Sequence, residues 1–273
     1  MITRQNLHTH TNYVDGVDSP RQMVEYALSF GLESLGFSEH AHTYFDDSCC
    51  MTKAQTLEYF DEINSLKAEY KGKIDIYLGL EIDLHDIRVY EGLDYTIGSL
   101  HCLPVEGKLY PVDYKPQMTQ FIKEKGYNND GVAMAVDYLK ILSKNIALSD
   151  ADIVGHIDLP TKFNGDNILF DEDSSEYKNA VIKAVDSILA FKKDIVFEVN
   201  TGAISRGYRT SPYPSKFVLK QLLDRNARLC ITSDCHNGKH LTCAFSETEA
   251  MLKNMGFKQL WQIKNNIWQA IPL

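Results

Sequence analysis

The 273-residue chain lacks several features that would assign it to common classes of protein. No apolar run approaches the roughly 20 residues that span a bilayer, and the residues after Met1 do not resemble a signal peptide. The six cysteines include no C-x-x-C pair and show no regular spacing, which indicates reduced thiols rather than a disulfide scaffold. We therefore expect a cytoplasmic protein with no membrane partner.

Positive charge is also scarce, because 28 Lys and Arg residues stand against 37 Asp and Glu residues, for a formal net charge of −9. Binding to nucleic acid irrespective of sequence requires a cationic surface, so we expect no nucleic-acid partner. A small anionic substrate is compatible with this charge, since bound metal ions can reverse the sign of the local field.

Short apolar runs alternate with longer helical patterns along the whole sequence. Strands separated by helices indicate βα units and a mainly parallel sheet, and about seven such units favour an α/β barrel over an open sheet. Residues 103–129 have weak periodicity and are predicted to form a long loop or lid with a short helix. No linker or low-complexity tract divides the chain, so one domain over residues 1–273 is expected. The predicted strands lie near residues 5–8, 34–38, 75–80, 95–99, 153–156, 195–200 and 228–232, and the predicted helices near 20–30, 53–70, 130–146, 174–191, 215–225 and 247–254.

Histidines follow the predicted strands closely. In a parallel barrel the carboxyl ends of all strands meet on one face, where active sites are built. Histidines scattered through a core would not coincide with strand ends in this way. Of the nine histidines, seven lie at or just after such an end: His8, His10, His40, His42, His101, His156 and His236.

Two carboxylates follow the same pattern. Glu81 comes directly after the apolar run 76–80, where a carboxylate would be costly without a partner; the alternative is a side chain that faces solvent. Asp234 and His236 share one side of the last predicted strand end. Imidazole and carboxylate groups without thiolates suit Zn, Mn or Fe at a hydrolytic site. The candidates outnumber the ligands of one ion, which favours a cluster of two or three metals.

The strand-end residues belong to six short motifs, which follow one another along the chain: His8-Thr-His10 with Asp15-Gly16, Gly36-Phe-Ser-Glu-His40, Gly79-Leu-Glu81, Ser99-Leu-His101, Gly155-His156 and Ser233-Asp-Cys-His236. Together and in this order, the motifs resemble those of the polymerase-and-histidinol-phosphatase (PHP) family. The resemblance implies a distorted (β/α)7, TIM-like barrel with a trinuclear metal centre at the carboxyl ends of its strands.

The resemblance also implies how the ligands are shared among three divalent metals, each Zn, Mn or Fe. Glu81 would bridge two of the metals. The other ligands of the first metal would be His8, His10 and Asp234, and those of the second metal would be His101 and His156. His40 and His236 would hold the third metal. Asp15 is expected to complete this third site, because it replaces a histidine that relatives have. His42 is a further candidate, either for the third metal or for contact with the substrate.

Within the family, the length and the order of parts resemble the stand-alone histidinol-phosphatases. The segment 198–206 is similar to the phosphate-binding segment of that branch, which implies that Arg206 clamps the phosphate. A solvated loop arginine is the alternative for Arg206. Lys162 is a second candidate cation. The implied reaction is hydrolysis of L-histidinol phosphate to L-histidinol and inorganic phosphate in histidine biosynthesis, by a metal-activated water and without a phosphoenzyme.

Several roles stay open at the level of sequence. Asp234 or a neighbouring histidine such as His236 would protonate the leaving group. Glu39, Asp83 or Glu198 would hold the substrate's amine. Two other functions compete with the histidinol assignment: a PHP phosphoesterase for another small phosphate ester, such as a nucleotide or sugar phosphate, and a PHP module that binds metal without catalysis.

Overall fold

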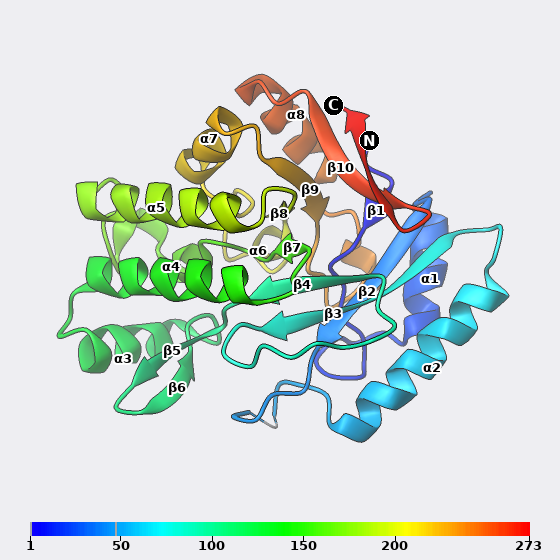
Figure 1. Cartoon of the computed structure of the whole chain (residues 1–273), viewed down its shortest axis with the longest axis horizontal. Coiled ribbons are helices and arrows are strands. Elements are labelled where there is room, and N and C mark those ends of the chain that lie inside the picture. Colours follow the sequence, from blue (N-terminus) through cyan, green and yellow to red (C-terminus); the bar gives the residue numbers. More distant parts are fainter. Residues whose placement is uncertain (1, 47) are drawn as a thin grey trace.

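In the computed structural model, which describes residues 2–46 and 48–273, one parallel sheet carries the fold (Figure 1). Each strand pairs in parallel with the next one in the sheet. Beyond the first and last strands, the backbone N–H of His10 donates to the carbonyl oxygen of Cys235 at 3.0 Å, which nearly closes the sheet into a barrel. The predicted α/β fold, a distorted (β/α)7 barrel, is thereby confirmed. In sheet order, the seven strands are β1 (Gln5–Asn6), β2 (Ser34–His40), β3 (Asp75–Asp83), β4 (Tyr95–Ser99), β7 (Ile153–Val154), β8 (Val196–Asn200) and β9 (Arg228–Thr232).

Helices on the outside of the barrel separate most of these strands. Helix α1 illustrates why they form where the sequence predicts them. Ser19 and Gln22 make reciprocal capping bonds at its start, Pro20 occupies its first turn, and Gly31 follows its end with a φ of +73°. No helix joins β3 to β4, where residues 84–94 form a loop. Six helices lie where the sequence predicts them: α1 (Pro20–Ser29), α2 (Lys53–Glu69), α4 (Gly131–Leu148), α5 (Ser175–Phe191), α7 (Lys216–Asp224) and α8 (Phe245–Met255).

The interior of the barrel is filled by side chains at the end opposite to the strand-end histidines. Tyr95 is 1% exposed, and its hydroxyl donates to the carbonyl oxygens of Leu7 and Phe37. Its ring occupies the space beside two glycines, Gly36 and Gly79, where side chains of neighbouring strands would otherwise lie. This packing closes one end of the barrel and leaves the carboxyl ends of the strands to form the site.

Residues 103–129 are more ordered than the sequence predicted. Strands β5 (Cys102–Val105) and β6 (Lys108–Pro111) form a hairpin, and helix α3 (Pro116–Gly126) follows it. The hairpin turns at Glu106 and Gly107, which have φ values of 50° and 79°, as expected for a tight two-residue turn. The prediction of a long loop with a short helix was therefore wrong for the hairpin, because each of its strands contains a proline, a residue that is rare inside strands.

A second hairpin lies at the C-terminus, where the sequence predicted no element. Strands β10 (Gln259–Lys264) and β11 (Ile267–Pro272) pair in antiparallel fashion, and Asn265 and Asn266 form the turn with φ values of 51° and 59°. Two consecutive asparagines between apolar runs were the available signal. The hairpin covers the closed end of the barrel, where the hydroxyl of Tyr77 donates to the carbonyl oxygen of Ile263 at 3.1 Å.

The remaining elements are short and belong to the loops. They are α6 (Gly202–Ser205) and the 3₁₀ turns Leu159–Phe163, Gly165–Asn167 and Gly238–His240. Among the described residues, no helix has the combination of length and apolar character needed to cross a bilayer.

Candidate metal centre

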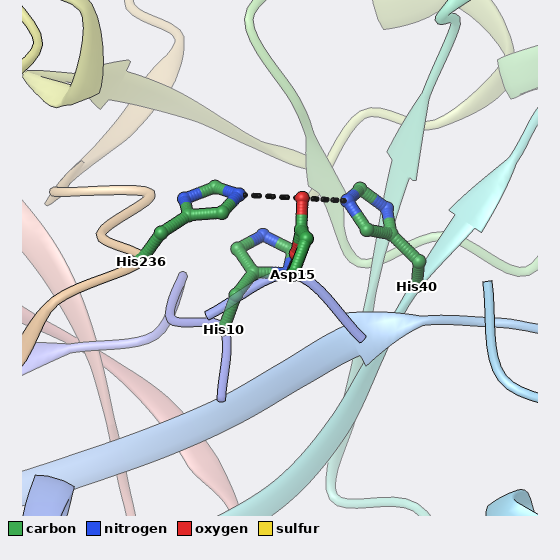
Figure 2. A group of neighbouring side chains, drawn as sticks. All are labelled: His10, Asp15, His40 and His236. Atoms are coloured by element: carbon green, nitrogen blue, oxygen red, sulfur yellow. Dashed lines mark hydrogen bonds and ion pairs between the residues drawn. The ribbon is translucent and has the colours of Figure 1, made fainter. Parts of the chain in front are cut away.

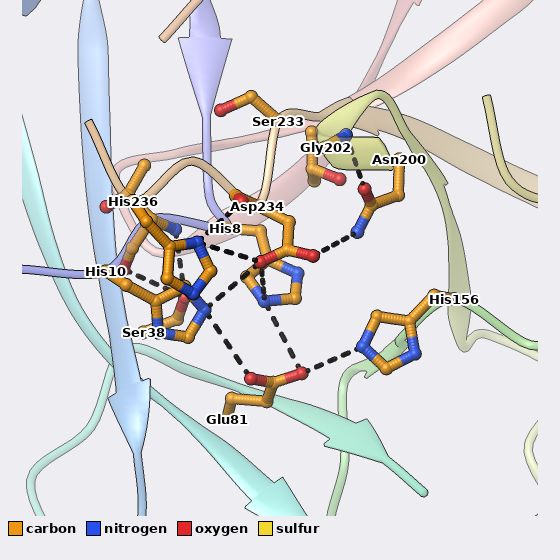
Figure 3. A network of polar contacts seen from close by, with 12 residues as sticks. His8, His10, Ser38, Glu81, His156, Asn200, Gly202, Ser233, Asp234 and His236 are labelled. Carbon is orange, nitrogen blue, oxygen red and sulfur yellow. Dashed lines mark hydrogen bonds and ion pairs between the residues drawn. The ribbon is translucent and has the colours of Figure 1, made fainter. Parts of the chain in front are cut away.

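Glu81 faces a group of imidazoles from different strand ends, and Figure 3 shows its contacts with His8, His10 and His156. Its carboxylate lies near the carboxyl end of strand β3 inside the barrel, and Glu81 is 1% exposed. Oε1 lies 3.2 Å from Nε2 of His156, 3.3 Å from Nε2 of His101 and 3.4 Å from Nε2 of His8. Oε2 lies 3.0 Å from Nδ1 of His40. The two oxygens of one carboxylate therefore face ligand atoms from β1, β2, β4 and β7.

Asp15 is the centre of a second group, nearer to solvent (Figure 2). Its Oδ2 lies 3.0 Å from Nε2 of His236 and 3.9 Å from Nε2 of His40, and its Oδ1 lies 3.9 Å from Nδ1 of His10. One ligand atom from each of these four residues lies within 4.8 Å of the others. The structure thus brings Asp15 to His40 and His236, with which the sequence grouped it, and also to His10, which was assigned to the first metal.

Asp234 joins the inner group from the loop after β9. Its Oδ1 lies 3.4 Å from Nε2 of His10 and 3.7 Å from Nε2 of His8. Its backbone has a φ of 45°, a conformation that few residues other than glycine adopt and that turns the carboxylate toward the barrel axis. Asp234 and Glu81 consequently face the same two imidazoles from opposite strands.

The arrangement of these donors fits divalent metal ions. Nε2 of His8 and both ring nitrogens of His10 are buried and have no hydrogen-bond partner among the described residues. Buried polar atoms without partners are costly and rare, unless a ligand satisfies them. Two ligands bound at about 2.1 Å to a tetrahedral ion lie roughly 3.4 Å apart, which is close to the separations around Glu81 and Asp234.

The charges of the cluster also suit metal binding. Burial alone would raise the pKa of Glu81, but the charges of His8, His101 and His40 hold it well below its usual range, so that the carboxylate is an anion. Burial and the positive charges of His236 and His40 lower the pKa of His10 to about 3. His10 is therefore neutral near pH 7 and keeps a lone pair for a metal.

A cavity of about 370 Å³ opens above the cluster, and its lining includes Arg206 and Lys162, the two cations that the sequence singled out. Arg206 donates from Nη1 to the carbonyl oxygen of Asp234 at 2.9 Å and from Nη2 to Oδ2 of Asp234 at 3.1 Å. Lys162 lies on the cavity wall and donates to Oδ2 of Asp113 at 3.0 Å. Asp113 comes from the chain after the β5–β6 hairpin and was missed by the sequence, because nothing local marks it as a partner of Lys162.

The structure does not bring His42 to this site. Within the described part of the chain, His42 neither lines the cavity nor belongs to a group of potential metal ligands. Strand β2 ends at His40, so the alternation of side chains along a strand does not place His42 beside His40.

The three carboxylates considered for the substrate's amine have different surroundings. Glu198 is 1% exposed and forms hydrogen bonds inside the barrel, including one of 2.8 Å with Nδ1 of His8, so it is not open to substrate. Glu39 is fully buried and accepts a hydrogen bond from the backbone N–H of Thr11. Asp83 lines the cavity, but its Oδ2 lies 3.2 Å from Nδ1 of His101.

Comparison with known proteins identifies the class to which this fold and this site belong. The sequence profile of the family described as PHP domain matches residues 6–202, so the chain belongs to the PHP domain family. The chain is 27% identical to the histidinol-phosphatase of Bacillus subtilis over 269 residues, which cover 89% of this chain and 97% of the relative. It is 25% identical to the histidinol-phosphatase of Lactococcus lactis over 272 residues, which cover 95% of this chain and 94% of the relative.

The fold is also similar to a solved structure. A crystal structure of histidinol phosphate phosphatase from Lactococcus lactis, in complex with zinc, L-histidinol and phosphate, superposes with a TM-score of 0.72. The match covers 97% of this chain and 98% of that chain at 21% identity. The likeness extends over nearly the whole length of both chains and confirms the barrel fold.

Proposed function

We propose that this chain is a metal-dependent phosphatase that hydrolyses L-histidinol phosphate to L-histidinol and inorganic phosphate. The observation that carries the proposal is one cavity that contains both a cluster of histidines and carboxylates and the two cations Arg206 and Lys162. The names of the curated relatives, which match over nearly their full length, support the same activity. Residues 1–273 would act as one PHP-type phosphoesterase domain.

Three groups of residues would hold three divalent metals, and the protein would accept Zn, Mn or Fe according to availability. Such metals, when bound, lower the pKa of a water molecule and neutralise negative charge on a phosphate. Glu81 would be shared between the first two groups. The groups are His8, His10, Glu81 and Asp234; Glu81, His101 and His156; and Asp15, His40 and His236.

The cations on the wall would bind and orient the phosphate. Arg206 is held in place by Asp234, and its Nε has no hydrogen-bond partner among the described residues. A guanidinium fixed in this way is preorganised to stabilise charge that develops on phosphate oxygens. Lys162 would contribute a second positive charge from the same wall, while Asp113 keeps its ammonium group in position.

Protonation of the leaving oxygen requires an acid, for which the sequence left Asp234 and His236 as candidates. Burial would raise the pKa of Asp234, but the charges of Arg206 and His8 hold it well below its usual range. Asp234 is therefore a poor proton donor near pH 7, and an imidazole that does not bind a metal would suit the role better. In this scheme a water molecule attacks the phosphorus atom and the protonated alcohol leaves in one step, without a phosphoenzyme.

The lining of the cavity favours a cationic leaving group. It includes the carboxylates of Asp46 and Asp83 and the aromatic rings of Phe45 and Tyr114. An amino alcohol with an imidazole ring complements this lining, because acidic groups attract its charge and aromatic rings contact its flat face. A nucleotide or a sugar phosphate lacks the cationic amine.

The proposal is tested by comparing kcat/KM of the zinc- or manganese-reconstituted protein for L-histidinol phosphate, adenosine monophosphate and glucose 6-phosphate. We expect a preference of at least about 100-fold for L-histidinol phosphate, because its amine and imidazole would pair with groups that the other esters leave unpaired. Similar low rates for the three esters would overturn the assignment of substrate. Absence of metal-dependent hydrolysis of any ester, including a chromogenic one, would favour the non-catalytic module.

A further inference from the structure

Glu198 accepts hydrogen bonds from four groups inside the barrel, although it lies outside the proposed ligand set. Oε2 lies 2.8 Å from Nδ1 of His8 and accepts from the hydroxyl of Thr232 at 2.7 Å. Oε1 accepts from the backbone N–H of His156 at 2.6 Å and from Nδ2 of Asn200 at 2.9 Å. The carboxylate, which is almost fully buried, thus connects the ends of β1, β7, β8 and β9.

The two groups that face Oε1 of Glu198 can act only as hydrogen-bond donors. A backbone N–H can only donate, and so can the amide nitrogen of Asn200. The orientation of that amide is fixed in turn, because Oδ1 of Asn200 accepts from the backbone N–H of Gly202 at 2.8 Å. Oε1 of Glu198 therefore has to be an acceptor, and an ionised carboxylate presents an acceptor at Oε2 as well.

This requirement determines where His8 carries its proton. Because Oε2 of Glu198 accepts, Nδ1 of His8 donates, and its Nε2 keeps the lone pair in the neutral ring. Nε2 is buried without a hydrogen-bond partner among the described residues, and it lies 3.4 Å from Oε1 of Glu81 and 3.7 Å from Oδ1 of Asp234. The lone pair thus points to the place where the proposed first metal would bind.

From this geometry we infer that Glu198 is a positioning residue that fixes the tautomer of His8, so that Nε2 serves as a metal ligand. The inference rests on the proposed metal centre. Carboxylates that accept from the second nitrogen of a metal-bound histidine orient the ring and strengthen the ligand, and their replacement costs about 10- to 100-fold in metal affinity or activity.

Replacement of Glu198 by glutamine provides a sharp test, because the two side chains have nearly the same shape. The glutamine oxygen has to face the N–H of His156 and the amide of Asn200, since its NH₂ group in that place would oppose two donors. The NH₂ group then faces Nδ1 of His8 and the hydroxyl of Thr232, both of which can accept. His8 would consequently carry its proton on Nε2, which blocks the lone pair needed for a metal.

The experiment compares zinc-reconstituted wild type, Glu198→Gln and the control Thr232→Val, which removes a donor from the same carboxylate oxygen without affecting an imidazole. Zinc affinity is measured by competition with a chelator, and the tautomer of His8 by long-range ¹H–¹⁵N NMR. We expect the weakest zinc site to lose about 10- to 100-fold in affinity in Glu198→Gln and to stay within about threefold of wild type in Thr232→Val.

A proton on Nε2 of His8 in the zinc-loaded wild type would overturn the inference, whether or not the glutamine variant folds. Wild-type zinc affinity in a folded Glu198→Gln would overturn it as well. Neither measurement uses substrate. If the wild type failed to hydrolyse L-histidinol phosphate but the variant lost zinc, the proposed substrate would be wrong and the role of Glu198 would stand.

Discussion

A methyl group on Gly79 would collide with the ring that fills the closed end of the barrel. An ideal Cβ at this position would lie 2.6 and 2.8 Å from two ring carbons of Tyr95, whereas carbon atoms in favourable contact are about 3.5–4.0 Å apart. The ring cannot easily move away, because Tyr95 is 1% exposed and its hydroxyl donates to two backbone carbonyls of neighbouring strands. Gly79→Ala therefore forces either the ring or strand β3 to shift.

Overpacking of this kind costs about 1–3 kcal/mol. Alanine also loses less conformational freedom on folding than glycine, which offsets the cost by about 0.4–1 kcal/mol. The matched control is Gly165→Ala, because a Cβ at Gly165 has nothing within 4 Å and its φ is not positive. The difference between the two variants isolates the collision, so we expect Gly79→Ala to be about 1–3 kcal/mol less stable than Gly165→Ala.

Thermal unfolding of both variants in the presence of a chelator measures this difference without a contribution from bound metal. For a chain of this length it corresponds to a melting temperature roughly 2 to 12 °C lower in Gly79→Ala than in Gly165→Ala. Equal melting temperatures for the two alanine variants would refute the account of how Tyr95 packs.

Three further predictions concern the site. His101→Ala removes a proposed ligand and is expected to lose metal and at least about 100-fold in kcat/KM; unchanged metal content and activity, measured together, would show that the proposed centre is wrong. Arg206→Lys keeps the positive charge but loses the planar guanidinium, which can donate two parallel hydrogen bonds. We therefore expect kcat/KM to fall about 10- to 150-fold, equivalent to about 1.5–3 kcal/mol. Wild-type kinetics in this variant would contradict the role of Arg206 in binding phosphate. Burial lowers the pKa of His40, but the negative charges of Glu81 and Asp15 outweigh the effect of burial and raise the pKa of His40 to about 9. His40 is thus protonated in the metal-free protein at pH 7, and zinc affinity should increase with pH toward 9 as the competing proton is lost. Calorimetry of zinc binding in two buffers of different ionisation enthalpy measures the number of protons released. If zinc binding released no protons, this assignment would be wrong.

The sequence alone was sufficient for the elements of the barrel. All seven barrel strands and the six helices with predicted bounds lie where the apolar patterns placed them, with ends shifted by a few residues. These signals are local: a strand alternates with a period of two, and a helix starts with bonds such as those between Ser19 and Gln22. The β5–β6 and β10–β11 hairpins escaped prediction because exposed or half-buried positions interrupt their strands, which therefore lack the continuous apolar run of a buried barrel strand.

For the site, the sequence determined which residue types stand at strand ends, and parallel strands bring those ends together. Which of the side chains meet depends on the path of the backbone beyond each strand, and only the tertiary structure decides it. His42 points elsewhere because β2 ends at His40, whereas Asp15 returns to the cluster from a loop. The burial of Glu198 against His8 likewise depends on strands 190 residues apart in sequence, so no local pattern encodes it.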